Sequence, residues 1–103
     1  MPKKVDVVSK IRKALSGVKD PELDLPITEL GLVYDIYMED DKAVIRMTLT
    51  TLGCPLFDVI EEDIRKRMKK IKEVDKVRLE LTFDPPWSPE MMTEDAKAKL
   101  GFL

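Results

Sequence analysis

The chain has 103 residues, of which 44% are hydrophobic and 37% charged, and its formal net charge is -2. This length and composition predict a folded protein with one domain and one core, and they exclude a disordered or membrane-spanning protein. Lysines and arginines are interleaved with acids, so we expect no nucleic-acid partner.

The chain contains one cysteine, Cys54, and no histidine. One cysteine cannot form an internal disulfide, and no apolar run of signal-peptide type comes before the first amphipathic segment, so we expect a cytoplasmic protein. No apolar stretch approaches the roughly 20 residues that a spanning helix needs, so we expect no membrane contact. Without histidine, one subunit has neither a histidine general base nor a histidine zinc ligand.

The first predicted element is a helix over about residues 6–16, where apolar residues recur at helical spacing. Asp6 is its expected N-cap, and Gly17 is expected to take the left-handed conformation that ends helices.

An acidic loop follows at residues 19–26, with two prolines and the carboxylates of Asp20, Glu22 and Asp24. Two interpretations stay open. The loop is either a turn in which Asp20 accepts hydrogen bonds from nearby backbone amides, or a polar wall that faces Cys54. After it, residues 27–31 are expected to form a tight turn that uses the backbone freedom of Gly31.

A hairpin is predicted next, with strands at residues 33–38 and 43–50 and a polar turn between them. The second strand alternates between apolar and polar side chains. Its expected core-facing residues are Ala43, Ile45, Met47 and Leu49.

The strongest predicted helix covers about residues 55–72, with acids in its early turns and bases in its later ones. Three ion pairs are expected four residues apart, Glu61 with Arg65, Glu62 with Lys66 and Asp63 with Arg67. A third strand is predicted at residues 76–83. A last helix is predicted from Pro89 to about Leu100, with Ser88 as N-cap and Gly101 as stop.

The order helix, hairpin, helix, strand, helix predicts an α+β fold. We expect a two-layer domain with a small three-stranded mixed sheet covered by helices, since a long helix crosses between the second and third strands. No linker divides the chain, so residues 1–103 are predicted to be a single domain.

Cys54 is the strongest candidate for chemistry, because it stands directly before Pro55, a residue that favours the first position of a helix. A thiolate there is stabilised by unpaired backbone N–H groups and by the helix dipole, which favours nucleophilic attack or metal binding. The alternative is a buried cysteine that acts as a small hydrophobic residue. Trp87, the one tryptophan, either clamps a loop onto the core edge or, if exposed, binds a partner.

Five motifs in this order resemble the iron-sulfur cluster assembly domain family, which is PaaD-like and SufT-like, and the resemblance covers about residues 5–101. The motifs are Asp20-Pro21-Glu22, Leu30-Gly31-Leu32-Val33, Met47-Thr48-Leu49-Thr50, Cys54-Pro55 and Asp84-Pro85-Pro86-Trp87-Ser88. The resemblance implies a maturation factor for iron-sulfur proteins rather than an enzyme. It implies cluster-assembly machinery and client apoproteins as partners.

By the same resemblance, the functional pocket consists of Asp20, Glu22, Thr51 and Cys54, and Trp87 binds a partner. Iron-sulfur clusters normally have four ligands, mostly cysteine thiolates, so one chain with one thiol is expected to bind no cofactor stably. Three alternatives stay open: a transient cluster on Cys54 with thiols from a partner or from a second subunit of a homodimer, an iron ion completed by Asp20 or Glu22, or an adaptor that touches only clients.

The alternative function is a small cysteine-dependent thiol enzyme. Cys54 would be the nucleophile, Thr51 a hydroxyl donor, and Asp20 or Glu22 the proton acceptor.

Overall fold

The computed structural model describes residues 4–49 and 57–101. The elements in this part of the chain are α1 (Lys4–Leu15), β1 (Val33–Glu39), β2 (Lys42–Met47), α2 (Phe57–Met68), β3 (Lys76–Leu81), the 3-10 helix η1 (Pro89–Met91) and α3 (Glu94–Lys99). The three strands form one mixed sheet in the order β1-β2-β3, with β1 and β2 antiparallel and β2 and β3 parallel. The predicted α+β fold with its three-stranded mixed sheet is confirmed.

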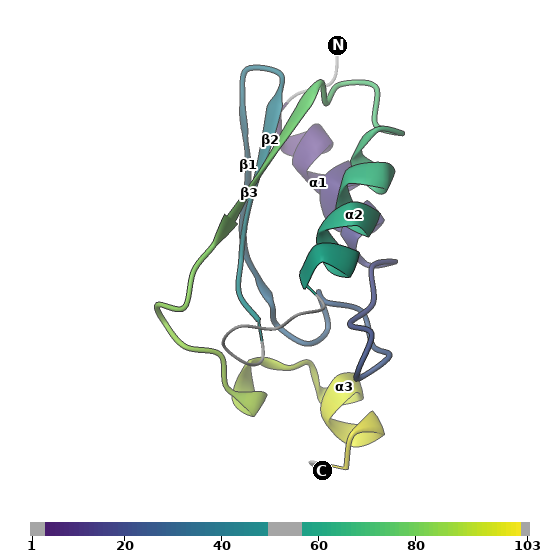
Figure 1. The fold of residues 1–103 in the computed structure, drawn as a ribbon, viewed down its shortest axis with the longest axis vertical. Helices are drawn as coiled ribbons and strands as arrows, with labels where there is room; N and C mark the ends of the chain where they lie inside the picture. Colours follow the sequence, from purple (N-terminus) through teal and green to yellow (C-terminus); the bar gives the residue numbers. More distant parts are fainter. Residues whose placement is uncertain (1–3, 50–56, 102–103) are drawn as a thin grey trace.

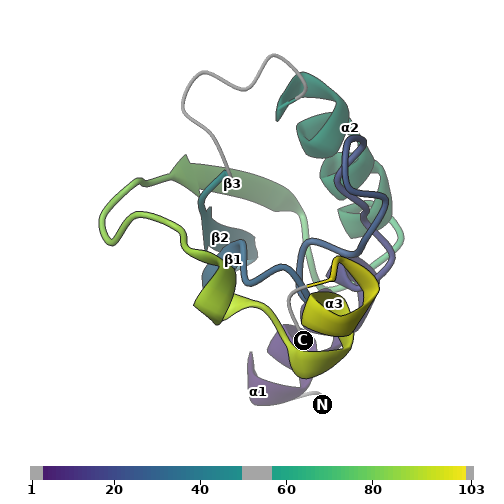
Figure 2. The ribbon, with the colours of Figure 1, turned by 90° about the horizontal axis from the view of Figure 1, so that it is seen from below.

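The molecule has two layers, because α1 and α2 lie on one face of the sheet (Figure 1). The segment after β3 leaves the sheet on the side away from α2, and α3 lies at the end of the sheet (Figure 2). No helix in the described residues is long and apolar enough to cross a membrane.

The core lies between the helices and the sheet, and the four predicted core residues of the second strand are all buried. Val44 and Thr48, which alternate with them, are also fully buried. β2 is the central strand, so its side chains have neighbours from β1 and β3 on both sides. The face of the second strand that carries Val44 and Thr48, which the alternation predicted to be polar, is therefore more buried than expected.

The ends of several elements differ from the predictions. α1 begins at Lys4, so Asp6 lies in its first turn instead of serving as N-cap. Gly17 does not take a left-handed conformation. A Cβ atom added at Gly17 would meet the guanidinium of Arg67, so the glycine leaves room for the end of this flexible side chain.

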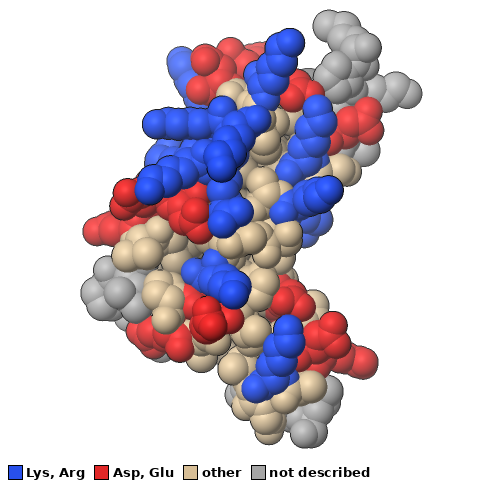
Figure 3. Space-filling model, turned by 90° about the vertical axis from the view of Figure 1, so that its right-hand side faces the viewer, with Lys and Arg blue, Asp and Glu red and all other residues tan. Residues whose placement is uncertain are grey.

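α2 ends at Met68, four residues before its predicted end at Lys72, because the N–H groups of Lys70 and Ile71 bond to carbonyls only three residues back. Its predicted start at Pro55 lies outside the described residues. The three predicted ion pairs are confirmed at 3.0, 3.7 and 3.1 Å. Figure 3 shows the helix side of the molecule, where lysines and arginines gather beside acidic side chains.

The predicted last helix is two separate short helices, because the chain extends at Met92 and Thr93 between η1 and α3. Thr93 caps α3 by accepting a hydrogen bond from the N–H of Ala96 at 3.2 Å. The side chain of Ser88 makes no capping bond within the described part of the chain. Gly101 has a φ of +84° and ends α3, as predicted. β2 and β3 are shorter than predicted, ending at Met47 and Leu81.

Candidate functional site

The acidic loop is closed by hydrogen bonds centred on Asp20. One carboxylate oxygen, Oδ1, accepts from the N–H of Glu22 at 2.8 Å and of Leu23 at 3.1 Å. The Asp20 N–H donates to the Leu25 carbonyl at 2.9 Å, and the side chain is largely buried. This is the first of the two interpretations of the loop: Asp20 holds the backbone of the turn.

Glu22 occupies the outer part of the same turn, and its side chain is exposed. Within residues 4–49 and 57–101 its carboxylate makes no hydrogen bond or ion pair. Asp24 is less free, since Lys19 approaches its carboxylate at 3.8 Å. Of the three acids in the loop, Glu22 is therefore the one most available to a ligand.

The loop lies beside α2 in both ribbon views (Figures 1 and 2). α2 is the element that follows Thr51 and Cys54 in the chain, but both of these residues lie outside the described residues. The structure therefore brings Asp20 and Glu22 together in one turn, and the predicted pocket of four residues stays a prediction.

Thr48 is a polar residue whose role the sequence did not reveal. It is fully buried, and its hydroxyl has no hydrogen-bond partner among the described residues. Its backbone N–H donates to the Leu32 carbonyl at 2.8 Å, which fixes its position at the end of β2. A buried hydroxyl without a partner is unusual in folded proteins and is a reason to suspect function. The available sequence signal was its place in the motif Met47-Thr48-Leu49-Thr50.

Trp87 clamps the segment after β3 onto the core. Its indole N–H donates to the Leu30 carbonyl at 2.6 Å, and the half-buried ring packs against the core cluster. Leu30 belongs to the tight turn before β1, where Gly31 has a φ of +77°, as its predicted turn role requires. These contacts fit the clamp interpretation, and partner binding by Trp87 stays a prediction.

No group of three or more cysteine, aspartate or glutamate side chains in the described residues is arranged to hold a metal ion. The donor atoms that the side chains of the acidic loop offer are carboxylate oxygens. Carboxylates alone are hard ligands that bind iron weakly and exchangeably.

Comparison with known proteins decides the family. The model of the family described as "Iron-sulfur cluster assembly protein" matches residues 9–81 of this chain, which include the acidic loop, all three strands and α2. The chain belongs to the iron-sulfur cluster assembly protein family. The resemblance drawn from the five sequence motifs is confirmed.

Individual members of this iron-sulfur cluster assembly family are similar over nearly the whole chain. An Fe-S protein maturation auxiliary factor of Porphyromonas gingivalis is 42% identical over 94 residues, which are 90% of this chain and 90% of that protein. The auxiliary factor YitW of Bacillus subtilis is 41% identical over 92 residues, 88% of this chain and 90% of that protein. A crystal structure of a domain of unknown function from Bacillus anthracis has a TM-score of 0.89 at 38% identity, covering 97% of this chain and 96% of that chain.

Proposed function

We propose that this protein is an iron-sulfur cluster assembly or targeting factor, which aids the maturation of iron-sulfur proteins by holding a partner at the acidic loop and the segment with Thr51 and Cys54. The observation that carries the proposal is the turn built by Asp20, in a loop that lies beside the helix following Cys54 in the chain. The exposed carboxylate of Glu22 in this turn has no partner among the described residues. The name of the Porphyromonas gingivalis relative supports the same function. We propose that residues 1–103 act together as one domain.

The cargo is a metal ion or cluster that passes through the site without staying. Cys54 supplies the only thiol of the chain, so the remaining soft ligands come from the partner or from a second subunit of a homodimer. Glu22 supplies a carboxylate that is free to bind iron or to accept a hydrogen bond from the partner. A site with one thiolate and a carboxylate releases metal easily, which suits transfer to a client. The cytoplasmic location expected from the cysteine content stays a prediction.

A pull-down from the native cytoplasm tests the proposal. The baits are the wild-type protein, Cys54→Ala, Glu22→Gln and the control Glu62→Gln, whose side chain is exposed on α2. We expect the wild type and the control to retain cluster-assembly proteins or client apoproteins, and both site variants to lose them. An unchanged set of partners with Cys54→Ala and Glu22→Gln would contradict the proposal.

The names of the relatives describe maturation factors rather than enzymes. A thiol enzyme with Cys54 as nucleophile predicts turnover, which the maturation factor does not. The purified protein is incubated with generic ester and disulfide substrates and, in parallel, with a thiol-directed probe. Turnover above background that the probe abolishes would replace the proposed function with the enzyme.

A further inference from the structure

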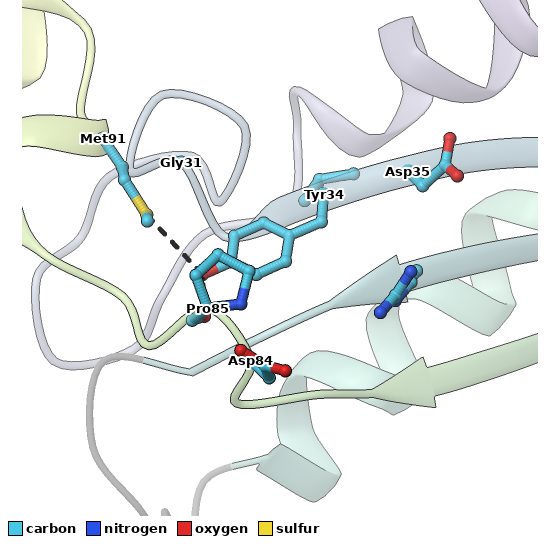
Figure 4. Close-up of a pocket in the computed structure, with 8 residues that line it drawn as sticks. Gly31, Tyr34, Asp35, Asp84, Pro85 and Met91 are labelled. Carbon is cyan, nitrogen blue, oxygen red and sulfur yellow. Dashed lines mark hydrogen bonds between the residues drawn. The ribbon is translucent and has the colours of Figure 1, made fainter.

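A cavity of about 540 Å³ lies on the side of the sheet away from α1 and α2, at the end where β1 begins (Figure 4). Asp35 and Arg46, which line it, alternate with Ile36 and Ile45, whose side chains are buried in the core. The cavity is therefore separate from the acidic loop, which lies beside α2 (Figures 1 and 2).

The walls of this cavity are fastened in place. The Tyr34 hydroxyl donates to the Pro85 carbonyl at 2.9 Å and lies 3.5 Å from the Met91 sulfur. The N–H of Thr93 donates to the Glu29 carbonyl at 2.9 Å, and Gly31 leaves room for the backbone of Met91. Together with the Trp87 clamp, these contacts hold the segment after β3 against the start of β1. The site is built before a ligand arrives, as ligand pockets usually are.

The lining of the cavity includes a change in strand register. Val33 lies opposite Met47 and Asp35 opposite Arg46, so Tyr34 is an additional residue in β1. Such a bulge re-aims side chains and is common beside functional sites. The ring of Tyr34 faces Pro85 and Met91, which gives the cavity an apolar side (Figure 4).

The other side of the cavity carries charges of both signs that are not paired. Arg46, Asp35 and Asp84 are exposed, and none of them forms an ion pair within the described residues. Arg46 lies in register with Asp35 on β1 and Glu80 on β3, yet Glu80 pairs with Arg78 at 2.9 Å. On α2, by contrast, neighbouring charges pair regularly. Unpaired Arg beside Tyr and Met is the composition of a protein-binding surface.

We propose that this pocket binds a short extended segment of a partner polypeptide that presents one apolar side chain between a basic and an acidic one. The apolar side chain packs against the apolar side of the pocket that Tyr34, Pro85 and Met91 form together. The acid pairs with Arg46, and the base pairs with Asp84, because Asp35 already accepts a hydrogen bond from the N–H of Ile36 at 3.0 Å. In an extended segment these three side chains come from alternate residues, since only those share a face.

A segment fits this surface better than a second copy of the chain. Three strands of about six residues present roughly 300 Å² of sheet face, whereas a stable interface buries about 800 Å² on each partner. The proposal goes beyond the proposed function, because it uses neither Cys54 nor the acidic loop.

The test is a titration of the ¹⁵N-labelled full chain with the blocked peptide Lys-Ser-Phe-Ser-Glu and with its reversed sequence, followed by NMR. We expect one of the two peptide sequences to shift the amide signals of residues 31–35 and 46 and of the non-proline residues within 84–91. Replacing its Phe by Ala, or its Glu by Lys, should weaken binding at least about tenfold, as loss of an anchor does. The wild type should prefer the peptide with Glu to the variant peptide in which Lys replaces this Glu. Arg46→Glu should invert this preference, and Arg46→Gln should abolish it. The control is Arg12→Glu, which reverses the charge of an exposed side chain on α1 and should bind the peptides like wild type.

Shifts outside the pocket, equal binding of the Phe and Ala peptides, or an unchanged preference in both Arg46 variants would overturn the proposal. Dimerisation that Arg46→Glu disrupts would overturn it too, in favour of a second copy as the occupant. The titration contains neither iron nor a client protein, so its failure would not contradict the proposed maturation function.

Discussion

Asp20 holds the backbone of the acidic loop through a single carboxylate oxygen that accepts two N–H groups. These hydrogen bonds need an oxygen acceptor but not a negative charge, so the two can be tested separately. Asp20→Asn keeps an oxygen acceptor of the same shape for the two N–H groups, so it should unfold close to wild type in urea. Asp20→Ala leaves both N–H groups without this acceptor and should lower the free energy of unfolding by about 1–3 kcal/mol.

The two variants also separate positioning from ligation. If Asp20 positions Glu22, the Asn variant supports client maturation in cells and the Ala variant does not. Loss of maturation in a well-folded Asn variant would show instead that the charge of Asp20 takes part directly.

Thr48 offers a second test at the scale of one atom. Valine has the shape of threonine without the hydroxyl, and the hydroxyl of Thr48 is buried without a partner in the described residues. Thr48→Val should therefore raise the free energy of unfolding by up to about 1 kcal/mol in urea titrations. Thr82→Val, which removes a hydroxyl that accepts from the Asp84 N–H at 3.2 Å, is the control and should not stabilise. A Thr48→Val variant less stable than wild type would mean that this hydroxyl is hydrogen-bonded in the folded protein.

At the scale of elements, two glycines with left-handed backbones form a matched pair. Gly31 has a φ of +77° and Gly101 a φ of +84°. Alanine at either position carries a backbone cost of roughly 1–2 kcal/mol. At Gly31 the new Cβ would also strike the Met91 carbonyl, whereas at Gly101 no atom of the described residues lies within 4 Å. Overpacking of this kind adds about 1–3 kcal/mol.

Gly31→Ala should therefore melt clearly below Gly101→Ala in calorimetry. It should also disturb the cavity beside Tyr34, because the Met91 backbone forms part of the same contact. Equal melting temperatures for the two variants would show that η1 moves aside without cost.

The elements differ in how far the sequence predicts them. α2 is readable from its charges, since acids and bases four residues apart pair as expected. The break between η1 and α3 is not, because Ser88-Pro89 and Thr93-Glu94 both read as helix starts and only the structure shows that the second one is capped by its side chain. The role of Gly17 depends on Arg67, about fifty residues later, which no local pattern reveals.

The candidate site is predictable to a similar degree. The hydrogen bonds from Asp20 to its own turn are local and were one of the two expected readings of the loop. The burial of Thr48 and the cavity beside Tyr34 depend on β2 being the central strand and on a bulge in β1. Both depend on how strands distant in the sequence pair with one another. The alternation of apolar and polar side chains within one strand contains no information about this pairing.

At the scale of the whole molecule, an ion pair ties α1 to the turn after α2. Lys10 donates to Glu73 at 2.6 Å, and this hydrogen bond is the main reason that the pKa of Glu73 is lowered. A carboxyl group whose pKa falls on folding stabilises the protein above its unfolded pKa of about 4.3, and the contribution disappears as the pH drops through the lower folded value.

Glu73→Gln should therefore unfold at a lower urea concentration than wild type at pH 7, and this difference should shrink steadily below about pH 4. The control is Glu62→Gln. The Glu62 side chain is 72% exposed and its carboxylate lies 3.7 Å from Lys66, so this variant should show a smaller difference at pH 7. If the deficit of Glu73→Gln is the same at pH 7 and pH 3, it comes from shape or packing and not from the charge.

The central claim is that a chain of this family uses the thiol of Cys54 in maturation and not for packing. The most direct measurement is the activity of client iron-sulfur enzymes in cells that lack the wild-type protein and express Cys54→Ser. Serine has nearly the volume of cysteine, so the purified variant should melt within a few degrees of wild type, given roughly 4–8 °C per kcal/mol for a domain of this size. Its hydroxyl stays protonated at neutral pH and is a poor ligand for soft metals, so client activity should be lost. Full client activity with Cys54→Ser would contradict the claim. It would leave the acidic loop that Asp20 holds, with Glu22 on its outside, and Trp87 as a partner-binding surface without thiol chemistry.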